Sequence, residues 1–345
     1  MPGVLRVVHC GLGPIGQSIA KLALATDGLK VVGAADPAPD KAGKDLAVVL
    51  GLPRKLRIKV APDIGKLLRR TRADVAVLST SSSLREVKAQ VTTLLKRGVN
   101  VVSTCEELAF PTPAHVNMFK DLDRLARRKR VSVIATGVNP GYTMDALALM
   151  LTAPCAQVNR VAVTRVVDAA TRRLPLQRKV GAGLNLNQFR RAITEGSVRH
   201  VGLTESVHMI AAGLGWTLDK VEETIEPAIA PRDLDTDFLR IPAGAAAGVK
   251  QVARAWRKGE LAISLDLQMY VGAENPRDHV LVDGTPRIDA TIAGGVAGDA
   301  ATAAITINCI PKLMAARAGL LTMRDIPLPH RFNSLDLKTL GPKKR

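Results

Sequence analysis

The chain has 345 residues, enough for two domains with substantial hydrophobic cores. A hydrophobic content of 47% excludes a largely disordered protein. The formal net charge is +18, but the basic residues are spread along the chain and accompany no helix-turn-helix, zinc-finger or RNA-binding aromatic motif. We therefore expect solvated basic helix ends and a field that favours anionic ligands, and we do not expect a nucleic-acid partner.

The cysteines and the N-terminal sequence bear on the cellular compartment. The four cysteines, at positions 10, 105, 155 and 309, form no C-x-x-C pair and no metal-ligand pattern, so we expect reduced thiols, a cytoplasmic protein and no metal. The sequence enters a strand-like run at once, which argues against a signal peptide. The apolar stretch Ala293 to Ile310 contains Asp299 and Asn308 and predicts a buried element rather than a membrane span.

The first 140 residues alternate strand-length apolar runs with amphipathic stretches of helix length. This pattern is typical of a parallel sheet with helices on both faces, so we expect an α/β fold that begins with a doubly wound Rossmann domain over residues 1–140. Within it, Leu84 to Arg97 places its apolar residues on one helical face and is stopped by Gly98. The expected strands are Val4 to Cys10, Lys30 to Ala35, Val75 to Ser79, Asn100 to Ser103 and Val131 to Thr136.

The sequence pattern changes at Asn139-Pro140-Gly141, where strand-length and helix-length segments stop alternating and longer strand-like segments follow. We expect a second α+β domain with an open mixed sheet over residues 141–297, and a final segment, 298–345, whose helix Gly298 to Ala315 returns to the Rossmann domain, with Asp299 as its N-cap. In the second domain, strands are expected at Val158 to Val167, Ala262 to Val271 and Val280 to Asp283, and helical stretches at Leu186 to Glu195, Leu203 to Leu214 and Asp219 to Glu226.

A glycine-rich motif follows the first expected strand. Gly11-Leu12-Gly13-Pro14-Ile15-Gly16 has the G-x-G-x-x-G pattern of a strand–turn–helix unit that binds a dinucleotide, with its pyrophosphate at the helix N-terminus. The alternative is a glycine-rich turn in some other βαβ unit. The residues that we assign to the cofactor are Gly11, Gly13, Pro14, Ile15 and Gly16.

Asp36 closes the next apolar run, 20 residues after Gly16. A carboxylate at this point can accept hydrogen bonds from the ribose hydroxyls of the adenosine. It favours NAD, because its charge repels a 2′-phosphate, yet Lys41 and Lys44 follow closely and could compensate. We expect NAD, and NADP stays open.

Polar residues follow the third and fifth strands, where ligands bind in open α/β sheets. Thr80, Ser81 and Ser82 belong to a hydroxyl-rich loop that could line the cofactor, although Ser and Thr also favour helix N-caps. Asn139 sits before a rigid Pro-Gly turn, where its amide could orient a nicotinamide carboxamide, although turns have this composition for conformational reasons alone.

Two adjacent acids, Glu106 and Glu107, follow the fourth strand. A carboxylate at this strand end could take a proton from an amine or an alcohol, or activate water. The alternative is that both enter the first turn of a helix, where the dipole favours negative charge.

The second domain offers fewer candidates. Arg165 stands in an otherwise apolar strand and needs a partner, either Asp168 or another acid as a structural pair, or a substrate carboxylate. His200 is a candidate for substrate binding, with an ordinary structural histidine as the alternative. Candidate apolar walls of a substrate site are Phe110, Tyr142, Phe189 and Trp216.

Taken in order, these segments resemble the 2,4-diaminopentanoate dehydrogenase family, whose relatives include NAD(P)-dependent amine dehydrogenases that act on simple ketones and amines. The matching stretches span nearly the whole chain, and the middle ones are more specific than the glycine motif. They are Gly11 to Gly16, Gly43 to Leu46, Ser103 to Leu108, Thr136 to Gly141, Pro175 to Gly183, His200 to Ser206, Leu214 to Trp216, and Gly294-Gly295 through Thr302.

The resemblance implies a dihydrodipicolinate-reductase-like architecture and a homodimer formed through the second domain. It also implies oxidative deamination of an amine to a ketone and ammonia, with reductive amination as the reverse. By resemblance Glu106 is the catalytic carboxylate, with Glu107 as the second candidate. Asn139 is similar to an amide that orients the cofactor and the site, and Arg165 to a residue that reaches a substrate carboxylate.

Two other classes of protein stay open from the sequence. The first is a related oxidoreductase of the dihydrodipicolinate reductase or homoserine dehydrogenase type, although we find neither a lysine pair placed for the cleft nor a basic run around a histidine to support it. The second is a non-catalytic protein that senses nucleotides or binds nucleic acid, which the net charge suggests.

Overall fold

The computed structural model describes residues 4–332, which form two compact units. Residues 4–141 and 297–332 make up the first unit, which we call the nucleotide unit. Tyr142–Val296 makes up the second, which we call the sheet unit. None of the helices within residues 4–332 is both long and apolar enough to cross a membrane.

The nucleotide unit contains a parallel six-stranded sheet of doubly wound type, with strand order β14-β5-β4-β3-β1-β2. The five strands expected from the sequence are confirmed to within a residue at each end. A sixth, β14, was not expected, because its three residues carry too short an apolar run to read as a strand. The strands are β1 (Leu5–Cys10), β2 (Leu29–Ala35), β3 (Val75–Leu78), β4 (Asn100–Ser103), β5 (Ser132–Ala135) and β14 (Gly319–Leu321).

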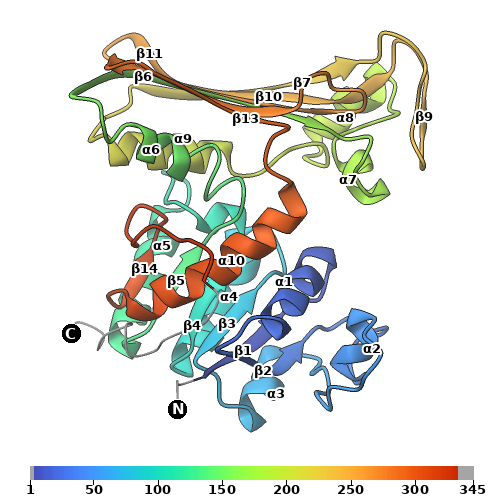
Figure 1. Ribbon diagram of the computed structural model, residues 1–345, viewed down its shortest axis with the longest axis vertical. Helices are drawn as coiled ribbons and strands as arrows, with labels where there is room; N and C mark the ends of the chain where they lie inside the picture. The colour runs from blue at the N-terminus through green and yellow to red at the C-terminus, as the bar shows by residue number, and fades with distance from the viewer. Residues whose placement is uncertain (1–3, 333–345) are drawn as a thin grey trace. The chain divides into compact units, whose positions relative to one another are not determined.

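Helices cover both faces of this sheet, as Figure 1 shows. Three helices, α3, α4 and α5, share one hydrophobic core with the sheet, and α1 packs against α10 and the sheet on the other face. The expected helix at the C-terminal side, α10, has its predicted bounds, but its N-cap is Ala297, and Asp299 lies in the first turn instead. The helical segments are α1 (Pro14–Leu24), α2 (Leu46–Leu50), α3 (Ile64–Arg70), α4 (Leu84–Lys96), η1 (Glu106–Leu108), α5 (Val116–Lys129) and α10 (Gly298–Ala315).

The sheet unit is built on a mixed six-stranded sheet, with strand order β13-β12-β6-β11-β10-β7. The pair of β6 and β11 is parallel and the other pairs are antiparallel. The strands are β6 (Gln157–Asp168), β7 (Lys220–Ile229), β10 (Ala246–Arg257), β11 (Glu260–Tyr270), β12 (Arg277–Thr285) and β13 (Ile288–Ala293), and β8 (Leu234–Asp235) pairs with β9 (Arg240–Ile241) in a separate ribbon.

The helices of this unit lie on one side of the large sheet (Figure 1). Two hydrophobic cores fill the space between the sheet and these helices. One of them contains Phe189, which is fully buried against Gly181 and is therefore a core residue, not a wall of a substrate site. The helices are α6 (Ala146–Leu151), α7 (Leu174–Lys179), α8 (Leu186–Thr194) and α9 (Leu203–Gly213).

The sequence prediction of a helix at Asp219 to Glu226 is wrong. This segment lies in β7, an edge strand of the sheet, with alternating half-buried and exposed residues. Val221, Glu223 and Ile225 are on the half-buried side, and charged residues occupy most alternate positions, which masks the period of two in a reading of hydrophobicity. Strands β10 and β13 were also missed.

His9, in β1, is buried without a polar partner. The side chain is 1% exposed, and neither ring nitrogen has a hydrogen-bond partner within residues 4–332. Burial lowers the pKa of His9 from its ordinary value of 6.5 to about 4, because the charged imidazolium would lose its hydration. The folded chain therefore keeps this ring neutral at pH values at which the unfolded chain binds a proton.

We predict that His9 makes the fold sensitive to acid. Above pH 6.5 this ring is neutral in both the folded and the unfolded chain. As the pH falls from 6.5 toward 4, the unfolded chain binds a proton here and the folded chain does not, so the free energy of unfolding falls by about 3 kcal/mol in total. Urea denaturation at pH 7.5 and pH 5 should show a clear loss of unfolding free energy in the wild type, and a smaller one in His9→Leu, which has no titrating group at position 9. An equal loss in both proteins would contradict this origin.

Candidate active site

The turn between β1 and α1 leaves no room for side chains at two of its glycines. Gly11 has φ +90°, and a Cβ there would lie 2.5 Å from the carbonyl oxygen of Ser79. A Cβ on Gly16 would lie 2.1 Å from the carbonyl oxygen of Gly11. A Cβ on Gly13 would meet nothing within 4 Å, so the backbone at this point faces open space. The turn is tight on its protein side and open at the residue that begins the helix.

This geometry fits a dinucleotide. Gly13 is the N-cap of α1 and has no side chain to satisfy the first N–H groups of the helix, and Pro14 follows it in the first turn. Free N–H groups and the positive end of the helix dipole then face the space above Gly13, as pyrophosphate binding requires. Gly11, Gly13, Pro14, Ile15 and Gly16 thus lie together at one end of α1.

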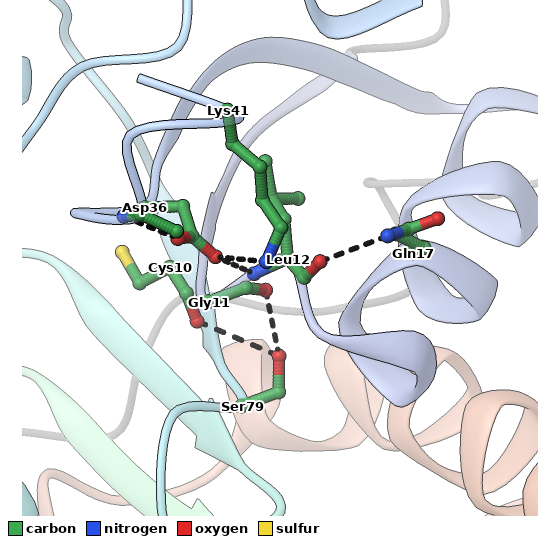
Figure 2. Close-up of polar contacts among 8 residues, drawn as sticks. Cys10, Gly11, Leu12, Gln17, Asp36, Lys41 and Ser79 are labelled. Atoms are coloured by element: carbon green, nitrogen blue, oxygen red, sulfur yellow. Dashed lines mark hydrogen bonds and ion pairs between the residues drawn. The ribbon is translucent and has the colours of Figure 1, made fainter. Parts of the chain in front are cut away.

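Asp36 lies at the end of β2 and is bound to this turn (Figure 2). Its Oδ2 accepts a hydrogen bond of 2.7 Å from the backbone N–H of Leu12, and its Oδ1 accepts one of 2.9 Å from Ala38. Lys41 places its Nζ 3.3 Å from Oδ2, and both side chains are largely buried. The carboxylate that would meet the ribose therefore already carries a cation beside it.

A serine-rich loop, Ser79 to Ser83, follows β3 and lies against the other side of the glycine turn. Ser79 donates to the carbonyl oxygen of Gly11 at 3.0 Å (Figure 2). Two of the residues predicted to contact the cofactor bind side chains of α4: Thr80 donates to Gln90 at 2.7 Å, and Ser81 to Glu86 at 2.5 Å. Their hydroxyls hold the loop on α4 in this structure.

A small cavity of about 50 Å³ lies at the ends of β4 and β5. That volume accommodates one or two water-sized groups, such as an amine nitrogen. Glu106 is the acid of its lining, and Asn139 contributes an amide to the same wall. The lining residues are Thr104, Cys105, Glu106, Ala109, Thr136, Gly137, Val138, Asn139, Pro140 and Thr302.

Burial keeps the thiol of Cys105, in the lining of this cavity, neutral. Removal from water raises the pKa of the Cys105 thiol far above its ordinary value, and the neighbouring Glu106 charge acts in the same direction. A neutral buried thiol is a poor nucleophile. The cavity therefore combines one carboxylate with hydroxyl and amide groups.

Thr302 is a member of this lining to which the sequence gave no role. It belongs to the second turn of α10, and its Oγ1 accepts a hydrogen bond of 3.4 Å from the backbone N–H of Val138. The two residues are 164 positions apart in the chain. Only the packing of α10 against the sheet brings them together, so no local pattern could have shown the contact.

Glu107 does not line the cavity. Its Oε2 accepts a hydrogen bond of 2.8 Å from the backbone N–H of Leu84, the first residue of α4, and lies 3.7 Å from Nε2 of His115. The sequence grouped the two glutamates together. The structure directs them to different surroundings.

The substrate candidates Tyr142, Arg165 and His200 belong to the sheet unit. Tyr142 and His200 are half-buried. The backbone of His200 is held by the fully buried Gln251, which accepts from its N–H at 2.8 Å and donates to its carbonyl oxygen at 2.7 Å. This clamp fixes the chain just before α9.

Arg165 forms a buried ion pair with Asp278, an acid that the sequence reading did not name, instead of Asp168. Nη1 of Arg165 lies 2.5 Å from Oδ1 of Asp278, and the two side chains are 4% and 0% exposed. Both side chains also bind the backbone of Val296. Nη2 of Arg165 donates to the carbonyl oxygen of Val296, and the N–H of Val296 donates to Oδ2 of Asp278, each at 2.7 Å. The guanidinium therefore has structural partners on both of its terminal nitrogens, Nη1 and Nη2.

Among known protein families, the family model described as the 2,4-diaminopentanoate dehydrogenase C-terminal domain matches residues 142–339. The chain belongs to the 2,4-diaminopentanoate dehydrogenase family. It is 30% identical to the 2,4-diaminopentanoate dehydrogenase of Acetoanaerobium sticklandii over 332 residues, which cover 94% of each chain. It is also 24% identical to an amine dehydrogenase of Streptomyces virginiae, over 97% of this chain and 99% of that one.

The fold of this chain agrees with that of a solved structure. The amine dehydrogenase of Mycobacterium smegmatis superposes with a TM-score of 0.85 at 22% identity, over 96% of this chain and 98% of that chain. The architecture expected from the family resemblance is thereby confirmed, since a parallel Rossmann-type sheet is combined with a mixed sheet in one chain.

We predict that Arg165 acts on stability rather than through a substrate. Arg165→Met or Asp278→Leu leaves a buried charge without its partner and should lower the free energy of unfolding by about 3–5 kcal/mol. The double variant Arg165→Met/Asp278→Leu should be less destabilised than the sum of the two single changes. Urea denaturation measures all three. Single variants that lose less than about 1 kcal/mol would contradict a structural pair.

Proposed function

We propose that this protein is an NAD(P)-dependent amine dehydrogenase, which deaminates an amine oxidatively to a ketone and ammonia and catalyses the reverse reductive amination. The observation that carries the proposal is the cavity at the ends of β4 and β5, which Glu106 and Asn139 both line, in the same unit as a glycine turn suited to a dinucleotide. Family membership supports the same reaction class, because two relatives that match 94% and 97% of this chain are a 2,4-diaminopentanoate dehydrogenase and an amine dehydrogenase.

Each group has a separate task in this reaction. When bound, the nicotinamide supplies the hydride acceptor for the carbon that bears the amine. Glu106 takes one proton from the substrate ammonium, so that the nitrogen lone pair can support loss of the hydride. Water then adds to the resulting iminium carbon, the carbon–nitrogen bond breaks, and the products are a ketone and ammonium, while the proton on Glu106 passes to solvent. Asn139 orients the reacting groups and the narrow cavity limits water.

The ion pair of Arg165 bears on the substrate class. Since its guanidinium is bound to Asp278 and to the carbonyl oxygen of Val296, we propose that it does not hold a substrate carboxylate. A substrate without a carboxylate then fits better than an amino acid. We therefore favour small amines and ketones, and place 2,4-diaminopentanoate second. A homodimer formed through the sheet unit stays a prediction.

We predict that Glu106→Gln abolishes most amine oxidation. Loss of a positioned base lowers the rate by about 10²–10⁴-fold, and the glutamine keeps the size of the side chain. Reduction of NAD and NADP should be followed with amines that carry a carboxylate and amines that do not. Glu260→Gln, a change at an exposed residue of β11, is the matched control and should behave as wild type. Undiminished turnover by Glu106→Gln would refute the assignment of the base.

We predict that Asp36 and Lys41 set the nucleotide preference together. Asp36 favours NAD, while Lys41, 3.3 Å from it, reduces the repulsion of a 2′-phosphate. Lys41→Met should lower kcat/KM for NADP about tenfold more than for NAD, as expected from the loss of one charge-assisted contact. Asp36→Asn should shift the ratio toward NADP. The exposed Lys55→Met is the control, and equal effects of Lys41→Met on both nucleotides would overturn the idea.

A further inference from the structure

The helix α4 begins without a capping bond from its own N-cap residue. Ser83 is the N-cap, and in the structure of residues 4–332 its side chain makes no hydrogen bond to the first turn. Glu107, from the neighbouring strand end, supplies one instead, because its Oε2 accepts from the N–H of Leu84 at 2.8 Å. A carboxylate at this point also meets the positive end of the helix dipole.

The same segment is tied to the serine-rich loop by its backbone. The N–H of Glu107 donates to the carbonyl oxygen of Ser82 at 3.2 Å. The thiol of Cys105 donates to that same carbonyl oxygen, also at 3.2 Å. Three contacts therefore join residues 105 and 107 to residues 82 and 84. Glu106, which lines the cavity, stands between the two joined positions.

The short helix η1 explains why adjacent glutamates can do different work. Successive residues of a 3₁₀ helix are rotated by about 120° about its axis. Glu106 turns to the cavity and Glu107 to the N-terminus of α4. Nε2 of His115 lies 3.7 Å from Oε2 of Glu107, and both side chains are mostly buried.

We propose that Glu107 is a positioning residue, which fastens the serine-rich loop to the strand end that carries Glu106 and so sets the direction of Glu106 and the wall of the nucleotide site together. The inference rests on the proposed function for the role of Glu106. Its own content is separate: Glu107 works through an oxygen that accepts the N–H of Leu84, and it does not take a proton from the substrate.

The distinction between acceptor and base can be tested by substitution. Glu107→Gln keeps an amide oxygen at the same reach and can still cap α4, but cannot act as a base. Glu107→Ala removes the acceptor. Glu107→Asp keeps the charge but shortens the reach by one methylene, and it serves as the second acceptor-deficient variant if Glu107→Ala does not fold.

The experiment compares amine oxidation and NADH binding in the wild type and in four variants, Glu107→Gln, Glu107→Ala, Glu107→Asp and Glu106→Gln. We expect Glu107→Gln to retain at least a third of wild-type kcat, with an unchanged pH profile. Glu107→Ala and Glu107→Asp should lose about tenfold in kcat and bind NADH about fivefold more weakly by calorimetry. Glu106→Gln should lose at least a hundredfold in kcat and bind NADH normally.

Two results would overturn the proposal. If Glu107→Gln is as inactive as Glu106→Gln, Glu107 acts as an acid or base. If Glu107→Ala and Glu107→Asp bind NADH and turn over like wild type, the contact with Leu84 positions nothing. Should the wild type oxidise no amine at all, the proposed function fails, but the binding series still decides whether Glu107 fastens the loop.

Discussion

The absence of space at Gly11 and Gly16 is the constraint on which the rest of the nucleotide unit depends. A Cβ on either glycine would collide with backbone, so β1, the start of α1 and the end of β3 approach as closely as main chains can. This approach lets Ser79 reach the carbonyl oxygen of Gly11 and lets Asp36 reach the N–H of Leu12. The ends of three strands are thereby fixed around one open point, Gly13, where a Cβ would meet no atom of the described residues within 4 Å.

From that point the contacts continue along the carboxyl edge of the sheet. The serine-rich loop starts at Ser79 and is joined through Ser82 and Leu84 to the segment that contains Glu106. The cavity beside Glu106 is closed by the turn at Asn139 and by Thr302 of α10. Because each loop is bound to the next, a change at one strand end alters the placement of groups at the others, which is the condition that catalysis by orientation requires.

The sequence predicted those features that depend on local pattern. Buried parallel strands are continuous apolar runs, so β1 to β5 were found, and the glycine motif identified the turn because a close approach of backbones demands glycine at fixed spacing. Strand β7 was misread because an edge strand can carry charges along its exposed side without losing its place in the sheet. The partner of Arg165 was missed because Asp278 is 113 residues away and reaches it only through the pairing of β12 with β6. Thr302 was missed because it is 164 residues from Val138 and reaches it only through the packing of α10 against the sheet.

The two glutamates after β4 show why residue type alone could not settle the site. Both are acids at a strand end, and both lie in the first turn of the short helix η1, which is the alternative that the sequence offered for the pair. Glu107 also meets the N-terminus of α4, a helix other than the one in which it lies. Glu106 is left in a cavity lined by hydroxyl and amide groups, beside a thiol that burial keeps neutral. A carboxylate that accepts the backbone N–H of Leu84 restricts the rotation of the short helix, and it thereby restricts the directions in which the neighbouring Glu106 can point along the cavity wall.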